Sequence, residues 1–322
     1  MVEHKIIITT YPFGHVNREP IELLNSIEAK FLTNSKKRKY TREEHLQVLR
    51  ESNPHIIIAG TEKYDKEALD IAKNLKLISR VGIGLDSVDL EECKKRDIIV
   101  TYTPDAPSNA VAELTICQML NMLRKVQNVS TDMQNDKWNR YIGREIKNCT
   151  VGIIGYGRIG KILYRILDSF ECKIVVHDIE WTDKLRPLPS WQKVSKNDIL
   201  NHCDIISIHI PLKDEKIDNH DYITKRELYM MKENVRLLNI SRGGIINEGD
   251  LYEWLKESPK ATVAIDTFNE EPYRDKLANM GNAYLTPHLG SCTEQSRLDM
   301  EYGAAKAVSD YIHKQPLRNR VV

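Results

Sequence analysis

The sequence of 322 residues lacks any apolar run near the roughly 18 residues that a membrane-spanning helix needs. Its first ten residues, MVEHKIIITT, contain a strand-like run that is too short for the apolar region of a secretory signal. It also lacks an excess of charge, because 47 Lys and Arg against 46 Asp and Glu give a net charge of +1. No strong field draws such a chain to nucleic acid or to an anionic membrane.

Cysteine pairs are absent as well. The six cysteines are scattered without a CxxC pair, and no histidine forms an HxxxH pattern with a neighbour. Neither a disulfide framework nor a metal site is therefore expected, and the thiols favour a reducing cytoplasm. The basic run KKRK at 36–39 could be a nucleic-acid or targeting patch, but we interpret it as a solvated surface beside a helix start.

The stretch 149–178 predicts a strand, a helix and a second strand, because β-branched runs at 151–154 and 173–177 bracket a segment of helical periodicity. Three glycines occupy the first turn of this unit: Gly155, Gly157 and Gly160. Glycines with this GxGxxG spacing allow a tight turn, a close approach of backbone to a pyrophosphate and close packing of helix on strand. The N-terminus of the following helix favours a phosphate anion. The stretch therefore predicts a dinucleotide site.

Asp178 ends the second strand of this unit, where a carboxylate can accept hydrogen bonds from ribose hydroxyls. A carboxylate repels the 2′-phosphate of NADP, and residues 179–182 supply no arginine to hold one. NAD is therefore the expected cofactor.

Strand and helix patterns alternate along most of the chain, which predicts an α/β protein with two doubly wound parallel sheets. The expected strands are 5–9, 55–59, 77–81, 98–102, 205–210, 237–241, 262–266 and 283–286, in addition to the two named above. A helix from 109 to about 124 is apolar on most sides and is expected to be buried between domains or subunits. A capping box, Ser291-x-x-Glu294, is expected to open the last helix.

Charged side chains follow three of the later strands, and ligands of open α/β sheets bind beyond such carboxyl ends. Arg242, Glu271 and His288 stand there, and Asp266 ends a strand. Reduction of a 2-keto acid needs a cation for the carboxylate and a proton donor near neutrality, which a carboxylate-partnered histidine supplies. On spacing alone, each of these residues could equally serve a turn or a buried structural contact.

Seven segments in order resemble those of the NAD-dependent D-isomer-specific 2-hydroxyacid dehydrogenases, on the 3-phosphoglycerate dehydrogenase-like side of that family. They are RVGIGLD at 80–86, VAELT at 111–115, GIIGYGRIG at 152–160, HIPL at 209–212, NISRGG at 239–244, DTFNEEP at 266–272 and PHLG at 287–290. The resemblance implies an enzyme of class EC 1.1.1.- with a flavodoxin-like substrate-binding domain (1–103 and 292–322) and a Rossmann NAD-binding domain (104–291). It also implies a homodimer in which the helix after Ser108 packs across the interface.

The resemblance further implies the role of each site residue. His288 would protonate the substrate carbonyl, Glu271 would orient His288 and stabilise its imidazolium, and Arg242 would hold the carboxylate and polarise the carbonyl. The cofactor would contact Gly155, Gly157, Arg158, Ile159, Gly160, Asp178, His209, Ile210, Pro211, Ile240, Asp266 and Gly290. The substrate carboxylate would bind at the turn formed by Arg80, Val81, Gly82 and Ile83.

Two alternatives accompany this interpretation. The same fold could serve an NAD-sensing, corepressor-like binding protein, since fold alone does not separate sensor from enzyme. An enzyme of the related formate dehydrogenase type is disfavoured, because such enzymes resemble this chain but pair the histidine with glutamine rather than with Glu271. The phosphoglycerate enzymes carry a phosphate-binding arginine near the position of Ala59–Gly60, where this sequence has none. The side group of the substrate therefore stays open.

Overall fold

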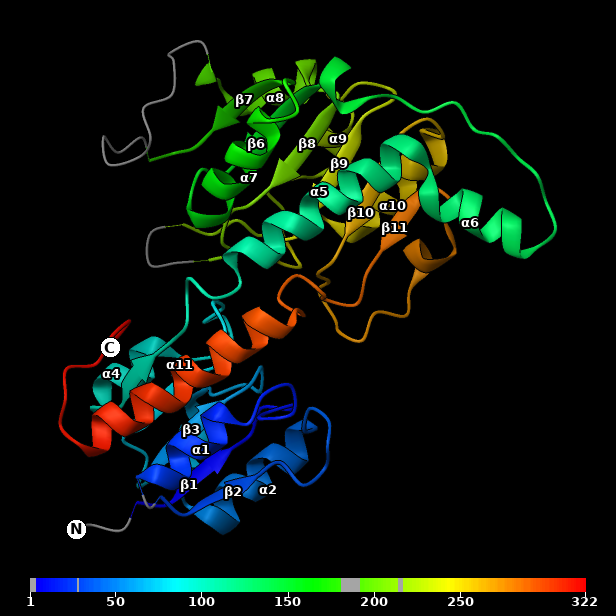
Figure 1. Cartoon of the computed structure of the whole chain (residues 1–322). Coiled ribbons are helices and arrows are strands. Elements are labelled where there is room, and N and C mark those ends of the chain that lie inside the picture. Colours follow the sequence, from blue (N-terminus) through cyan, green and yellow to red (C-terminus); the bar gives the residue numbers. More distant parts are fainter. Residues whose placement is uncertain (1–3, 28, 181–191, 214–216) are drawn as a thin grey trace. The chain divides into compact units, whose positions relative to one another are not determined.

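The computed structural model describes residues 4–27, 29–180, 192–213 and 217–322. The chain divides into two compact units, each built around its own sheet (Figure 1). The first unit contains residues 1–107 and 292–322, and the second contains residues 108–291. The boundary predicted at residue 103 lies before the one that separates the two units. Among the described residues, no helix has the length and apolar character needed to cross a membrane.

The first unit is a five-stranded parallel sheet in the order β2-β1-β3-β4-β5. Its strands are β1 (Ile6–Ile8), β2 (Phe31–Thr33), β3 (Ile56–Ala59), β4 (Leu77–Arg80) and β5 (Ile99–Thr101). Its helices are α1 (Glu19–Ser26), α2 (Arg42–Ser52), α3 (Lys66–Ile71), α4 (Leu90–Lys95) and α11 (Glu294–Ile312). This strand order is that of flavodoxin-like sheets, the fold that the resemblance implied for this unit.

Both faces of this sheet are covered by helices, which explains why its central strands β1 and β3 are apolar at every position. Ile6, Ile8 and Leu77 pack on one face against α1 and α11, whose buried side chains include Leu24, Met300, Ala304 and Val308. Ile7, Ile57 and Ile78 pack on the other face against α2, α3 and α4. Strands buried on both sides lose the alternation of polar and apolar residues. The return of α11 therefore completes the core of the first unit (Figure 1).

The second unit is a six-stranded parallel sheet in the order β7-β6-β8-β9-β10-β11. Its strands are β6 (Thr150–Ile154), β7 (Lys173–His177), β8 (Ile205–Ile208), β9 (Arg236–Asn239), β10 (Thr262–Ile265) and β11 (Ala283–Leu285). Its helices are α5 (Ser108–Arg124), α6 (Val126–Gln134), α7 (Arg158–Asp168), α8 (Lys196–His202), α9 (Lys225–Leu228) and α10 (Glu248–Glu257), with 3-10 turns at Ile146–Asn148 and Lys276–Asn279.

The direction of strand addition reverses beside β6 in this sheet, because β7 lies on one side of β6 and β8 on the other. Ligands of open parallel sheets bind beyond the carboxyl ends of the strands at such a switch point. Helices α5 and α7 cover one face, with Met119 and Leu163 among the buried side chains, and α8, α9 and α10 cover the other (Figure 1). The fingerprint turn after β6 thus stands where the fold presents a ligand.

The structure corrects one expected helix start. The last helix begins at Glu294 with Thr293 as its N-cap, whose hydroxyl accepts a hydrogen bond from the Ser296 N–H. The predicted capping box at Ser291 is therefore wrong, since the chain turns into the helix two residues later. A capping box formed by Thr41 and Glu44 opens α2.

The sequence patterns did not predict three short elements, β2, α6 and α8. Strand β2 lies at the edge of the sheet, where Leu32 is 65% exposed, so its side chains carry no regular pattern of burial. Helix α6 has no buried residue, which removes the apolar stripe by which a surface helix is recognised.

Met300 tests whether α11 belongs to the core of the first unit. Its side chain is 2% exposed, and the Met300→Ala substitution should lower the free energy of unfolding by about 2–5 kcal/mol through lost burial and the cavity left behind. Tyr302→Ala on the exposed side of the same helix should change it by much less. Chemical denaturation followed by circular dichroism measures both. Equal effects of the two substitutions would contradict this packing.

Candidate active site

The fingerprint turn after β6 adopts a conformation that glycine favours. Gly155 has φ +97°, and a Cβ there would overlap the backbone carbonyl of His209. A Cβ on Gly160 would overlap the carbonyl of Gly155, so glycine at 160 lets α7 lie against the turn. At Gly157, by contrast, an added Cβ would meet nothing within 4 Å. Two of the glycines are thus explained by protein packing, and Gly157 faces open space.

That open space suits a pyrophosphate. Gly157 is the N-cap of α7, an eleven-residue helix whose first turn contains Arg158 and Ile159. The first N–H groups of a helix lack intrahelical partners and carry the positive end of its dipole. Asp178 ties the end of β7 to the same turn, because its carboxylate accepts a hydrogen bond from the Tyr156 N–H at 2.5 Å. The residues present therefore fit a dinucleotide, with the phosphates at the helix start and a ribose near Asp178.

The end of β8 contacts the fingerprint turn. The His209 N–H donates to the Ile154 carbonyl at 2.7 Å, and the Ile210 side chain lies 2.9 Å from the position of a Cβ on Gly155. The imidazole Nε2 of His209 is 2.8 Å from the Ser207 hydroxyl, and burial lowers the pKa of His209 to about 4. His209 is therefore neutral near pH 7. The Pro211 carbonyl accepts a hydrogen bond from the buried Asn219 side chain.

A buried carboxylate organises the loop after β11. Asp266 is fully buried and accepts hydrogen bonds from the Leu289 N–H at 2.7 Å, the Gly290 N–H at 2.8 Å and the Thr286 hydroxyl at 2.6 Å. Burial raises the pKa of Asp266, whereas these hydrogen bonds and the nearby His288 oppose that rise. A Cβ on Gly290 would lie 3.3 Å from the Asp266 carboxylate and 3.9 Å from the Ile240 side chain. The predicted cofactor residues Ile240, Asp266 and Gly290 are thus neighbours.

His288 and Glu271 form the candidate catalytic pair. The His288 imidazole Nδ1 lies 3.0 and 2.9 Å from the two carboxylate oxygens of Glu271. The backbone of His288 has φ +53°, and its N–H donates to the Asp266 carbonyl at 2.9 Å. The side chains remain 44% and 37% exposed. Because the carboxylate contacts Nδ1, the other ring nitrogen, Nε2, is the one suited to exchange a proton with a ligand.

The turn that carries Arg242 packs against the loop that carries Glu271. A Cβ on Gly243 would overlap the carbonyl of Phe268, whose N–H in turn donates to Glu271 Oε1 at 3.2 Å. The Asn239 side chain donates to the Arg242 carbonyl at 2.7 Å. Strands β9, β10 and β11 are neighbours, so their carboxyl ends carry Arg242, Asp266 and His288 along one edge of the sheet.

In the first unit, the turn after β4 is internally hydrogen bonded. The Val81 N–H donates to the Ala59 carbonyl at 3.0 Å, and the Gly82 N–H donates to the Thr103 hydroxyl at 2.8 Å. Arg80 is buried, and its guanidinium lies over Gly82, which has φ +130°. Ile83 is half-buried at the end of this turn.

The structure thus groups the predicted residues of the second unit at two neighbouring parts of one sheet edge. The fingerprint glycines, Asp178, His209 and Ile210 lie around β6–β8, and the remaining ones lie around β9–β11. Sequence reasoning assigned no role to Asn239, Asn219 and Thr286, whose polar side chains brace the loops. Asn239 and Thr286 sit at strand ends before predicted site residues, which is the one signal that could have indicated them. Of residues 179–182, used in the cofactor argument, 181 and 182 lie outside the described residues.

Known proteins resemble this chain in sequence and in fold. Residues 116–290 match the family model described as the NAD-binding domain of D-isomer-specific 2-hydroxyacid dehydrogenases. A glyoxylate reductase of Thermofilum pendens is 35% identical over 276 residues, covering 83% of this chain and 80% of that enzyme. A D-3-phosphoglycerate dehydrogenase of Methanocaldococcus jannaschii is 33% identical and covers 80% of this chain and 49% of that enzyme. The crystal structure of an NAD⁺-bound 3-phosphoglycerate dehydrogenase of Entamoeba histolytica superposes with a TM-score of 0.82 at 25% identity, covering 100% of this chain and 99% of that one.

The two glycines that open α7 should respond differently to alanine. Gly157→Ala should leave the melting temperature nearly unchanged, since its Cβ meets nothing, but should weaken NADH binding on the order of tenfold by obstructing the pyrophosphate. Gly160→Ala should lower the melting temperature, because the Cβ overlaps the turn. Thermal unfolding without ligand and NADH fluorescence titration measure the two effects. Unimpaired NADH binding by Gly157→Ala would place the phosphates elsewhere.

Proposed function

The chain belongs to the D-isomer-specific 2-hydroxyacid dehydrogenases, and we propose that Arg242, Glu271 and His288 carry out its catalysis. The protein is an NAD-dependent oxidoreductase that acts on the CH–OH group of a D-2-hydroxy acid or reduces the matching 2-keto acid. An NAD-sensing binding protein on the same fold is not favoured, because the relatives reported above are enzymes. The contact of His288 with Glu271, on a loop held by buried Asp266, is the observation that supports the catalytic assignment.

Each residue has a separate task in this mechanism. The bound nicotinamide supplies or accepts the hydride. His288 donates a proton from Nε2 to the carbonyl oxygen during reduction and takes it back during oxidation. Glu271 holds the ring through Nδ1 and stabilises its imidazolium form. The Arg242 guanidinium binds the substrate carboxylate and polarises the carbonyl, for which its planar, charged donors are suited.

Binding of the cofactor and substrate uses further residues. Gly157, Arg158 and Ile159 at the start of α7 are proposed to bind the pyrophosphate, and Asp178 to bind the ribose and select NAD. Asp266 already accepts three hydrogen bonds, and two carboxylate oxygens offer about four acceptor sites, so about one site remains for the carboxamide. In the turn Arg80–Ile83, the first two N–H groups after Arg80 donate internally. A carboxylate bound there by backbone N–H groups would use those of Ile83 and Gly84.

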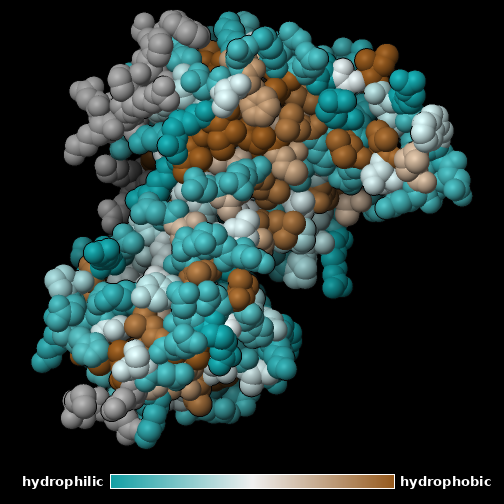
Figure 2. Space-filling view, in the orientation of Figure 1, coloured by the Kyte–Doolittle hydropathy of each residue, from teal (hydrophilic) through white to brown (hydrophobic). Residues whose placement is uncertain are grey.

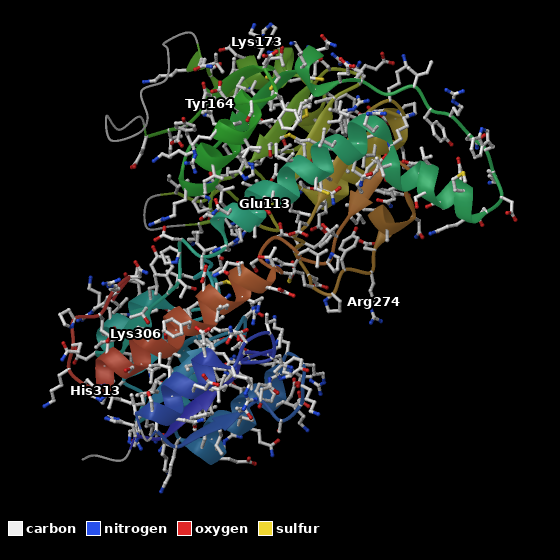
Figure 3. The ribbon with its side chains drawn as sticks, in the orientation of Figure 1. Glu113, Tyr164, Lys173, Arg274, Lys306 and His313 are labelled. Atoms are coloured by element: carbon white, nitrogen blue, oxygen red, sulfur yellow. The ribbon has the colours of Figure 1, made fainter. Side chains whose placement is uncertain are left out.

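We also propose that the chain forms a homodimer in the cytoplasm, through α5 and the segment after α6. Apolar surface gathers over α5 and α7 (Figure 2), where Leu114, Ile116 and Ile162 are only partly buried. The segment after α6 exposes Trp138 and Ile142, and Ile142 is 97% exposed. Glu113 on α5 and Tyr164 on α7 mark these helices in Figure 3. Extended apolar surface of this kind is typical of a protein interface, and a second copy is the occupant that the resemblance implies.

His288 provides the direct test of the mechanism. His288→Ala should reduce kcat on the order of 10²–10⁴, the contribution of a general acid, with little change in NADH affinity. His202→Ala, at an exposed position on α8, is the matched control and should retain activity. The measurement is NADH absorbance with a panel of 2-keto acids. Unimpaired turnover by His288→Ala would remove this residue from the mechanism, and binding of NADH without turnover of any acid by the unmodified protein would favour the sensor.

Ile142 tests the homodimer. At about 10 µM the unmodified protein should sediment as twice its 37.2 kDa, and Ile142→Asp should shift it toward the monomer by burying a charge in the interface. Leu32→Asp places the same charge on an exposed apolar position of the first unit and should not alter the mass. Analytical ultracentrifugation distinguishes the species. A monomeric unmodified protein, or a dimeric Ile142→Asp variant, would refute this interface.

A further inference from the structure

The first unit has a topological switch point of its own, and the proposed mechanism uses only the Arg80–Ile83 turn beside it. Its chain order reverses at β1, which lies between β2 and β3, and ligands bind beyond the carboxyl ends of such strands. Thr9 follows β1 there, and Gly60 and Glu62 follow β3. Arg80 ends β4, the next strand, and is paired in register with Ala59 at the end of β3. Four residues from three neighbouring strand ends therefore share one edge.

The polar side chains at this edge are buried and held in place. Glu62 is 4% exposed, and its carboxylate accepts a hydrogen bond from the Thr9 hydroxyl at 3.3 Å. The same hydroxyl lies 2.7 Å from the hydroxyl of Tyr64, which is fully buried. Burying a charge is costly without such partners. Glu62 is thus a fixed acid at a position where the fold presents ligands.

The absence of a side chain on Gly60 leaves room for the Glu62 carboxylate. A Cβ on Gly60 would lie 2.6 Å from Glu62 Oε2, so any larger residue would displace that oxygen. Burial raises the pKa of Glu62, whereas Lys39, Thr9 and Arg80 act in the opposite direction. The carboxylate and the Arg80 guanidinium therefore interact across neighbouring strands, which are spaced about 4.8 Å apart. The edge carries a buried cation next to a buried anion.

The basic loop after β2, residues 36–39, does not place a fixed positive charge beside Glu62. Arg38 forms an ion pair with Glu44 at 2.7 Å, and Lys36 lies 3.7 Å from the same carboxylate. Lys37 and Lys39 are exposed. Exposed lysines are solvated and mobile at a surface, whereas Glu62 is held by its neighbours. The fixed charge beyond Arg80 is therefore negative.

We propose that Glu62 determines which side group the substrate carries. The inference rests on the proposed function, in which the Arg80–Ile83 turn binds the substrate carboxylate. A group one strand spacing further along the edge then meets the Glu62 carboxylate, which accepts hydrogen bonds and repels anions. Glu62 thus favours a small side group with a hydroxyl donor, such as hydroxymethyl, and disfavours the same group as a phosphate ester.

Two 2-keto acids that differ only by a phosphate provide the test, namely hydroxypyruvate and 3-phosphohydroxypyruvate. With NADH at about pH 8, the unmodified full-length protein should prefer hydroxypyruvate by at least about tenfold in kcat/KM. Glu62→Gln removes the charge but keeps the shape, and should reduce that preference by about tenfold. Glu62→Asp keeps the charge and should retain the preference for hydroxypyruvate. Glu51→Gln removes an exposed charge at the far end of α2, so this control variant should also retain the preference.

A merely structural role would change both substrates alike, so the ratio of the two kcat/KM values is the deciding quantity. The inference is overturned if the unmodified protein prefers the phosphorylated acid, or if folded Glu62→Gln keeps the original ratio. Should Glu62→Gln fail to fold, the ratios of the unmodified protein and of Glu62→Asp still decide. Absence of turnover with every 2-keto acid would instead refute the proposed function, and this inference with it.

Discussion

The buried carboxylate of Asp266 is the contact on which the candidate catalytic loop depends. Its oxygens accept hydrogen bonds from Thr286, Leu289 and Gly290, and its backbone carbonyl accepts the His288 N–H. A carboxylate withdrawn from water is stable only when donors replace its hydration. The loop that satisfies Asp266 is therefore fixed, and with it the left-handed backbone at His288 that brings the imidazole to Glu271.

Parallel sheets explain why chemically active residues gather at strand ends in both units. Every strand of such a sheet points the same way, so the loops after the strands share one edge, while helices bury both faces. In the second unit this edge carries the fingerprint turn, Asp178, Arg242 and His288. In the first it carries Thr9, Glu62 and Arg80. The same architecture occurs twice, and in each unit charged side chains follow the strands at one edge of the sheet.

Strong local signals made much of this predictable. The β-branched runs and the glycine spacing each encode a local structure, and most strands lie where these signals place them. Elements without such a signal were missed, as at exposed β2 and at α6, which buries no residue. The last helix shows the same limit, because both Ser291 and Thr293 are chemically suited to cap it and only the path of the chain selects Thr293.

The sequence by itself determined the two-sheet fold class, the dinucleotide fingerprint and the family, since periodicity and motif spacing are properties of neighbouring residues. Only the tertiary structure decided what distant residues do together. It shows that Asp266 holds the His288 loop and that Thr9 holds Glu62. These are hydrogen bonds between strand ends far apart in sequence, which form only after the sheet has set its strand order and register. No spacing along the chain encodes them.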